Sequence, residues 1–577
     1  MQCRFQTDEV YLRLGLANVS YTLVTREETM QVNADPGASQ ISEESAKVDL
    51  AFICDIRISR DISNHEKQHV EARKRIVQKC LQKFHIECPK DNFPTVAVLG
   101  SGGGLRALIA LQGTLRELQE HNMLDTVMYL CGVSGSTWCM SYIYENEEWG
   151  KQLKSLEDKL CERLVDPHQD WKKILKILKN LIEPSKDDTY SLTDFWGYFV
   201  AYIILNELDD DHHLSDEQTI CKNGIVPYPI YAAVDATKLD DANRFHSDIW
   251  FEFTPHESGF FNPGAFVDVT YLGSKFNNGK LKEKKNEKKM TYLREYRCSC
   301  DCCKVALAII KFFLYTMESQ TCMMENKTHA DVKKHIINIT EILENKGPSD
   351  TYNFCCTLKE IDYSLDLTEN GKHILKLVET LQLEFTDIWD IVTFMHKSLA
   401  CILTWKWGNI SNYTYKYIDL KDKNLTDKTN IQLADAGLVI NSAYPLILRP
   451  ERKVEFILSF DFSEGDPFET IKEASQYCKE NKLPFPEIDA RNLDKDKDNP
   501  EDCYIFRSNG CPTVMHFPLF NKVNCEGHVS DWRNRYTTFN KTSYPKQDIQ
   551  NLLEAAKINV RNNAEKIRQT LKSVANP

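Results

Sequence analysis

Two glycine-rich turns early in the chain carry the residues best suited to chemistry. The first reads Gly100-Ser101-Gly102-Gly103-Gly104-Leu105-Arg106, and the second reads Gly132-Val133-Ser134-Gly135-Ser136. The backbone N–H groups of Gly103 and Gly104 could hold an oxyanion, with Arg106 as a fixed positive charge beside them. Ser134, on a tight turn next to glycine, would be an exposed nucleophile. Together the two turns are typical of a lipase active site.

A serine hydroxyl is a weak nucleophile at neutral pH, so Ser134 needs a base within hydrogen-bonding distance. The turn departs from the G-x-S-x-G elbow of Ser-His-Asp hydrolases, because Ser136 stands where the second glycine is expected. Asp435 is the best candidate base, since its small neighbours Ala434, Ala436 and Gly437 let it sit at a tight turn. Taken alone, such an aspartate is more commonly a turn former. The alternative is a triad in which His516, or else His528, is the base.

Both turns follow short apolar segments and precede helical ones. Residues 95–99 are apolar and β-branched, end in the first turn and are followed by a helical pattern over 107–119. Residues 127–131 form a second buried strand, which leads through the second turn into a helix beginning near Trp138. Residues 454–460 resume the strand pattern. We therefore predict an α/β fold with a central, mostly parallel sheet flanked by helices, and the two turns at the carboxyl ends of its strands.

The remaining segments suggest one large domain with two additions. Residues 1–60 hold only short apolar patches and a polar stretch, which predicts a partly disordered N-terminal extension. Residues 61–577 would form the catalytic domain. Within it, residues from about 319 to 400 are helical, polar and irregular, which predicts an inserted helical cap.

Two predicted amphipathic helices carry basic residues. The first spans residues 65–84, and a helix packed on the core is favoured there over one lying on a membrane. The second spans residues 549–574 and places Lys557, Arg561, Lys566 and Lys572 on its polar side. These helices are the candidate sites of contact with a membrane surface.

Composition excludes some classes of protein. The 71 basic and 84 acidic residues give a net charge of −13, which argues against a nucleic-acid binder. No signal segment is recognised at the N-terminus, so the 20 cysteines are expected to be mostly reduced and the protein cytoplasmic. The cluster at residues 298–303 lacks the spacing of a zinc finger, so we interpret it as plain thiols and expect no metal. The apolar run at residues 305–315 is too short to span a bilayer.

The order of these motifs resembles that of a known family. The two glycine turns and Asp435-Ala436-Gly437 occur as they do in the cytosolic, group IV phospholipases A2, relatives of the patatin lipases. Blocks between them are also similar and lie at residues 191–196, 227–230, 250–255, 273–276, 459–463 and 516–520. The resemblance covers the chain from about residue 65 onward and is greatest to the gamma type of the family.

The resemblance implies a function and roles for individual residues. Ser134 would attack an acyl ester, Asp435 would be the base of a Ser/Asp dyad, and the amides of Gly103 and Gly104 would bind the oxyanion. Arg106 and Arg452 match positions that the family uses around the phosphate head group, where a guanidinium suits a phosphodiester. The substrates would be phospholipids and lysophospholipids at membrane surfaces, with hydrolysis and lysophospholipid transacylation as variants of one mechanism.

The sequence also departs from the family in ways that matter. Fewer than about 65 residues precede the match, so we expect no calcium-binding C2 domain and a calcium-independent enzyme without a cofactor. After Gly273-Ser274-Lys275-Phe276 the chain has Tyr296-Arg297-Cys298-Ser299-Cys300 in place of the family's Trp-Gly-Ser block. A catalytically silent lipid-binding member of the family therefore stays open as an alternative. Oligomeric state, acyl-chain preference and target membrane are not predicted.

Overall fold

The computed structural model describes residues 56–88, 93–165, 181, 184–191, 193–194, 212–239, 245–290, 408–537 and 544–576. Most of the predicted N-terminal extension, the predicted cap at 319–400 and the cysteine cluster at 298–303 lie outside these residues.

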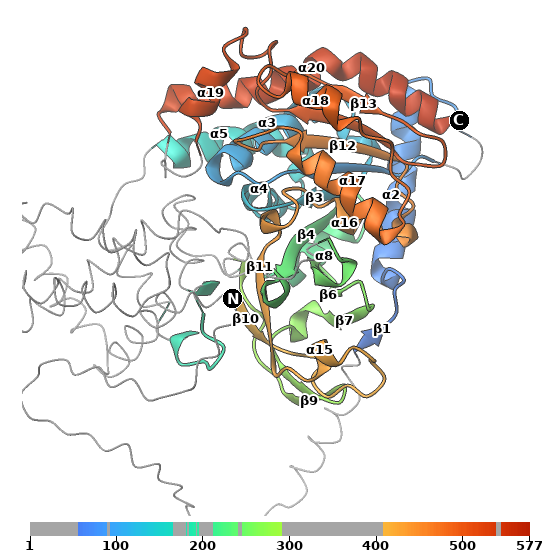
Figure 1. Ribbon diagram of the computed structural model, residues 1–577, viewed down its shortest axis with the longest axis vertical. Helices are drawn as coiled ribbons and strands as arrows, with labels where there is room; N and C mark the ends of the chain where they lie inside the picture. The colour runs from blue at the N-terminus through green and yellow to red at the C-terminus, as the bar shows by residue number, and fades with distance from the viewer. Residues whose placement is uncertain are drawn as a thin grey trace, which may run out of the picture. The chain divides into compact units, whose positions relative to one another are not determined.

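Among the residues that the structure describes, a sheet of twelve strands forms the centre of the fold, and a separate hairpin holds two more strands. Figure 1 shows their arrangement. Ten strands follow the order β1-β7-β6-β5-β4-β3-β2-β12-β14-β13, while β11 joins the edge of β4 and β10 pairs with β11. The strands are β1 Arg57–Ile58, β2 Val96–Gly100, β3 Val127–Gly132, β4 Tyr228–Asp235, β5 Trp250–Phe253, β6 Glu257–Phe260, β7 Ala265–Asp268, β8 Lys275–Asn277, β9 Lys280–Glu283, β10 Gly408–Ser411, β11 Asn430–Asp435, β12 Phe456–Asp461, β13 Tyr504–Phe506 and β14 Thr513–Pro518.

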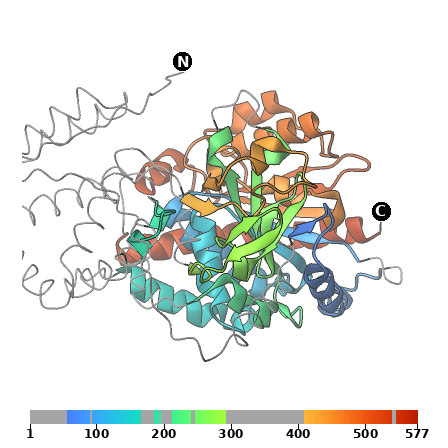
Figure 2. The same ribbon diagram turned by 90° about the horizontal axis from the view of Figure 1, so that it is seen from below.

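The middle of the sheet is parallel, as the sequence predicts. The pairs β4–β3, β3–β2, β2–β12 and β12–β14 are parallel. In the β2–β3 pair, Gly100 at the end of β2 lies opposite Gly132 at the end of β3. Strands β2 and β3 are buried along their whole length, which explains their continuous apolar sequences. The predicted α/β class is therefore confirmed, and short antiparallel strands extend the sheet on both sides. In Figure 2 the molecule is seen from below, with the antiparallel strands that come after β4 in the chain and helices around them.

Helices flank this sheet. Helix α3 packs against α4, α5 and α20, and these helices form one layer, whereas α2 lies against β3 and β4, and α16 lies against β5 (Figure 1). The helices are α2 Asn64–Lys83, α3 Gly104–Glu120, α4 Gly135–Tyr144, α5 Trp149–Val165, α8 Glu217–Cys221, α15 Lys423–Thr426, α16 Tyr444–Ile447, α17 Glu469–Asn481, α18 Ala490–Asp496, α19 Val529–Arg535 and α20 Lys546–Ala575. The predicted helices at 65–84, 107–119 and 549–574 are confirmed as α2, α3 and α20, and α4 begins three residues earlier than predicted.

Strands β3 and β11 meet end to end on one edge of β4. Strand β5 bonds to the opposite edge, because Tyr231 pairs with both β3 and β5, and Ala233 pairs with both β11 and β5. On the shared edge, β3 is parallel to β4 and ends with Gly132 opposite Tyr231. Strand β11 is antiparallel and ends with Asp435 opposite Ala233. The carboxyl ends of the two strands thus converge within about two residues, roughly 7 Å, of each other along β4.

Candidate active site

Ser134 lies on a sharp turn between β3 and α4. Its backbone has φ 51° and ψ −127°, a conformation that few residues other than glycine adopt. It occupies the N-cap position of α4, and its side chain is largely buried, with the residue 8 % exposed. Such a strained backbone at the end of a buried strand is typical of functional sites, where it holds a side chain at the edge of the sheet.

The glycine loop joins β2 to α3 and presents unpaired amides. Gly103 has φ 151° and Gly104 has φ 54°, conformations that glycine adopts without steric cost. The N–H of Ser101 donates to the Phe460 carbonyl at 3.1 Å, and the N–H of Gly102 donates to the Asn441 carbonyl at 3.1 Å. Within the described part of the chain, the N–H groups of Gly103 and Gly104 have no hydrogen-bond acceptor. They stand at the positive end of the α3 dipole, where a negative charge is favoured.

The two turns are packed directly against each other. A Cβ atom placed on Gly135 would lie 1.8 Å from the carbonyl oxygen of Gly104, so only glycine fits there. A Cβ atom placed on Gly102 would lie 2.9 Å from the Cβ atom of Ser134. The Ser136 hydroxyl also donates to the Ser101 carbonyl at 2.6 Å. The candidate nucleophile and the candidate oxyanion donors are therefore brought together.

Asp435 lies at the carboxyl end of β11, close to the carboxyl end of β3 on the shared edge of β4. It ends β11 and begins a 3-10 turn, η6 (Ala436–Leu438), in which its Oδ1 accepts a hydrogen bond from the Gly437 N–H at 2.8 Å. The residue is 5 % exposed. A Cβ atom placed on Gly437 would lie 3.1 Å from Asp435 Oδ1 and 3.6 Å from Val133 Cγ1, next to Ser134 in the chain. The fold thus places the candidate base in the same small region as the candidate nucleophile.

Arg106 lies under the glycine loop and is almost fully buried. Its Nε donates to the Phe462 carbonyl at 2.7 Å, and its Nη1 donates to the Tyr536 carbonyl at 2.6 Å. Glu464 lies 3.7 Å from Nη1. Burial lowers the pKa of Arg106, while neighbouring acidic groups, Glu464 among them, oppose that shift. Nη2 faces Gly103, since a Cβ atom there would lie 2.9 Å away, so one nitrogen of this guanidinium lies close to the loop.

Arg452 lies in a different environment, inside a buried ion-pair network. Its Nε and Nη2 donate to the carboxylate of Glu66 at 2.8 and 3.1 Å. Nη1 and Nη2 donate to Glu252 at 2.8 and 3.1 Å, and Nη1 also donates to the Leu446 carbonyl at 2.7 Å. An arginine side chain has five N–H donors, so these five bonds engage its full donor capacity. The structure does not bring Arg452 to the glycine loop by any contact among the described residues.

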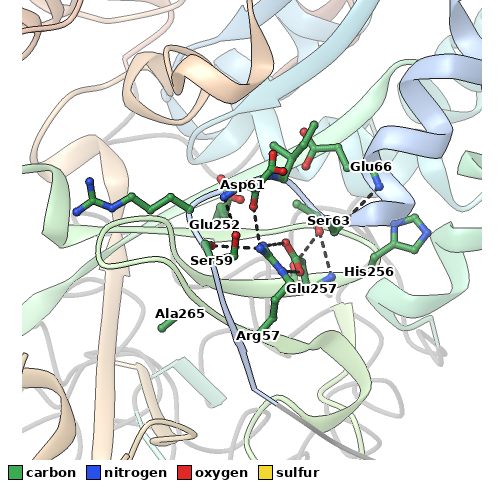
Figure 3. A network of polar contacts seen from close by, with 12 residues as sticks. Arg57, Ser59, Asp61, Ser63, Glu66, Glu252, His256, Glu257 and Ala265 are labelled. Atoms are coloured by element: carbon green, nitrogen blue, oxygen red, sulfur yellow. Dashed lines mark hydrogen bonds and ion pairs between the residues drawn. The ribbon is translucent and has the colours of Figure 1, made fainter. Parts of the chain in front are cut away.

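Other buried or half-buried ion pairs lie close to Arg452. Glu252 also pairs with Arg449, and the nearby Arg57 donates through Nε to Glu257 at 2.8 Å (Figure 3). Burial raises the pKa of Glu252, but Arg449 and Arg452 outweigh it and hold the pKa below its ordinary value. The bonds of Arg452 and Arg449 join α2, which holds Glu66, and β5, which holds Glu252, to the turn before β12, and sequence reasoning missed this network.

Among the described residues, no contact joins Ser134 to either candidate histidine, His516 or His528. His516 is fully buried in β14, and its Nε2 lies 2.7 Å from the carbonyl of Pro467. Strands β2 and β12 separate β14 from β3, which corresponds to about 14 Å across the sheet. Burial lowers the pKa of His516. The side chain of His528 is 73 % exposed and lies 3.5 Å from Asp531.

Three of the four basic residues predicted on the polar side of α20 pair with the protein's own carboxylates. Lys557 lies 2.6 Å from Glu157, and Arg561 pairs with Glu117 at 2.9 Å. Lys566 lies 3.9 Å from Asp502. In α2, the buried Arg73 donates to backbone carbonyls, including that of Gly224 at 2.9 Å. Both helices are therefore packed on the core.

The described residues contain no cluster of three or more His, Cys, Asp or Glu side chains that could hold a metal. Their ten cysteines are free thiols. None of the helices described has the length and apolar character needed to cross a bilayer.

Known proteins resemble this chain in sequence and in fold. Residues 96–499 match the family model described as a lysophospholipase catalytic domain. Cytosolic phospholipase A2 gamma of Homo sapiens is 36% identical over 90% of this chain and 96% of its own length. The same-named protein of Mus musculus is 33% identical over 88% of this chain and 91% of its own length. Among solved structures, human GIVD cytosolic phospholipase A2 has a similar fold, with a TM-score of 0.65 at 21% identity over 90% of this chain and 68% of its own. The match to the family model and the shared length with these relatives show that this chain belongs to the cytosolic phospholipase A2 family.

Proposed function

We propose that this protein hydrolyses the fatty-acyl esters of phospholipids and lysophospholipids through a Ser134/Asp435 dyad. The observation that supports this proposal is the convergence of the ends of β3 and β11 on β4, together with the packing of the Ser134 turn against the glycine loop. The family model and the names of the relatives support phospholipid esters as the substrate class.

In the proposed mechanism, Asp435 accepts the proton of the Ser134 hydroxyl while the serine oxygen attacks the ester carbonyl. The amides of Gly103 and Gly104 stabilise the resulting oxyanion. Collapse of this intermediate breaks the ester bond, and the alcohol leaves with the proton that Asp435 returns. Water then attacks the acyl-serine, with Asp435 again as base, and releases the fatty acid. A second lysophospholipid in place of water gives transacylation.

The head group is proposed to contact Arg106. Its Nη2 lies next to the glycine loop and makes no hydrogen bond with the described residues. At Arg452, binding of a phosphate would require the bonds to Glu66 and Glu252 to open. We therefore assign the head-group role to Arg106 and a structural role to Arg452.

We further propose that the enzyme needs no calcium and works in the cytoplasm at membrane surfaces. The dyad chemistry requires no metal, since both proton transfers and oxyanion binding use the chain's own groups. We retain the division into an extension at residues 1–60 and a catalytic domain at 61–577 with a cap near 319–400 as part of this proposal.

Release of fatty acid from phosphatidylcholine and lysophosphatidylcholine vesicles in the presence of a chelator tests this function. Wild-type protein should be active, whereas Ser134→Ala and Asp435→Asn should each lose about 10²-fold or more, as expected when a nucleophile or its base is removed. Wild-type turnover that requires added calcium would contradict calcium independence. A folded protein without turnover on either lipid would instead support the silent lipid-binding alternative.

A further inference from the structure

Asn441 joins three segments at the candidate active site. It lies three residues beyond the η6 turn that follows Asp435. Its Nδ2 donates to the Gly102 carbonyl at 3.2 Å and to the Ser463 hydroxyl at 2.9 Å. Its own backbone carbonyl accepts the Gly102 N–H at 3.1 Å. One residue thus holds the glycine loop after β2, the turn after β11 and the loop after β12.

These bonds fix the direction of an amide that the proposed mechanism uses. The Gly102 carbonyl and the Gly103 N–H belong to the same peptide unit, which is planar and trans, so they point in opposite directions. A hydrogen bond that holds the carbonyl therefore also sets where the Gly103 N–H points. Because Gly103 and Gly104 have positive φ and no side chain, the loop has little else to restrict rotation of this peptide.

The same residue lies against the turn that carries Asp435. A Cβ atom placed on Gly437 would lie 2.9 Å from Asn441 Oδ1 and 3.1 Å from Asp435 Oδ1. On Gly102, a Cβ atom would lie 2.3 Å from Asn441 Oδ1 and 2.9 Å from the Cβ atom of Ser134. The amide of Asn441 is therefore packed between the loop next to the nucleophile and the turn of the base.

We propose that Asn441 is a positioning residue for the oxyanion site. It acts through its neighbours: it orients the Gly103 N–H through the Gly102 carbonyl and keeps the glycine loop in register with the Asp435 turn. This inference rests on the proposed function. Its effect should appear in the chemical step, since a misdirected donor weakens binding of the transition state more than binding of the substrate.

Asn441→Asp is the sharpest test, because it keeps the shape of the side chain and replaces the Nδ2 donor by an oxygen that faces the Gly102 carbonyl. Asn441→Ala removes the contact without adding charge. Ser463→Ala is the matched control, since it removes only the second bond of Nδ2. The Gly102 N–H to Asn441 carbonyl bond is a backbone contact that all three variants can keep.

We would measure kcat and KM on lysophosphatidylcholine together with the thermal unfolding midpoint of each variant. We expect both Asn441 variants to lower kcat at least about 10-fold, less than the roughly 10²–10³-fold cost of deleting a whole oxyanion donor. KM and the unfolding midpoint should stay close to wild type, as should kcat of Ser463→Ala.

Wild-type kcat in Asn441→Asp would overturn the inference while leaving the dyad intact. A loss that parallels a lowered unfolding midpoint, or an equal loss in Ser463→Ala, would overturn it in favour of a structural role. Absence of turnover in the wild type would refute the proposed function itself, and the inference with it.

Discussion

Replacing Arg452 by methionine separates a structural role from a head-group role. The substitution keeps much of the side-chain volume but removes the guanidinium that bonds Glu66 and Glu252, all three residues being almost fully buried. Breaking a buried ion pair by removing one partner costs about 3–5 kcal/mol, because the remaining charge is left without compensation. That is a large part of the 5–15 kcal/mol that typically stabilises a folded protein.

The assay is urea unfolding followed by circular dichroism at neutral pH. With a denaturant slope of roughly 3 kcal/mol/M or more, the midpoint should fall on the order of 1 M. Lys74→Met is the matched control, because Lys74 forms an exposed pair with Glu71 on the same helix as Glu66, and exposed pairs contribute only about 0–1 kcal/mol. An unchanged midpoint with a raised KM for phospholipid would refute this reasoning and favour head-group binding by Arg452.

The same network predicts a dependence on acid. The pKa of Glu252 is held below its ordinary value of 4.5, with burial opposed by Arg449 and Arg452. A carboxylate of this kind contributes its full stability above its unfolded pKa, and that contribution is lost as the pH falls through the lower folded pKa. The acid-sensitive part of the stability should therefore be smaller in Arg452→Met than in wild type.

Three other substitutions give separate checks. Gly135→Ala should abolish activity, because its Cβ would lie 1.8 Å from the Gly104 carbonyl and would displace the loop; an active, folded variant would contradict this packing. His516→Asn should keep its activity per folded molecule, since Nε2 bonds to Pro467, whereas a folded but inactive variant would support the triad. Burial lowers the pKa of His256 to about 4, so the free energy of unfolding should fall as the pH drops from 6.5 towards 4. That slope should flatten in His256→Asn, and an unchanged slope would contradict the assignment.

The parts of the site that were predicted from sequence have local signals. Glycines at positions of positive φ, such as Gly103 and Gly104, and an apolar strand directly before each turn can be read within a few residues. The parallel centre of the sheet follows from two successive strand–turn–helix units. The small neighbours of Asp435 also make it the best candidate base, and the order of motifs, which resembles that of a family, favours this role over that of a turn former.

Long-range features had no such signal. Arg452 bonds to Glu66 and Glu252, which lie 386 and 200 residues away in the chain, so its sequence neighbours do not indicate that its donors are engaged. The antiparallel strands β5, β6 and β7 have four residues each, too few for periodicity to separate them from loops. Asn441 is an ordinary polar residue until the fold places it against Gly102.

Covalent labelling of the active serine tests the central claim most directly. A fluorophosphonate with a fatty chain phosphonylates a serine only where a base and an oxyanion site activate it. Mass spectrometry of the wild-type protein in chelator should show one adduct, on Ser134, at a rate that falls about 10²-fold or more in Asp435→Asn. Ser134→Ala should show none. Adduct formation on another residue, or an unchanged rate in Asp435→Asn, would contradict the Ser134/Asp435 dyad.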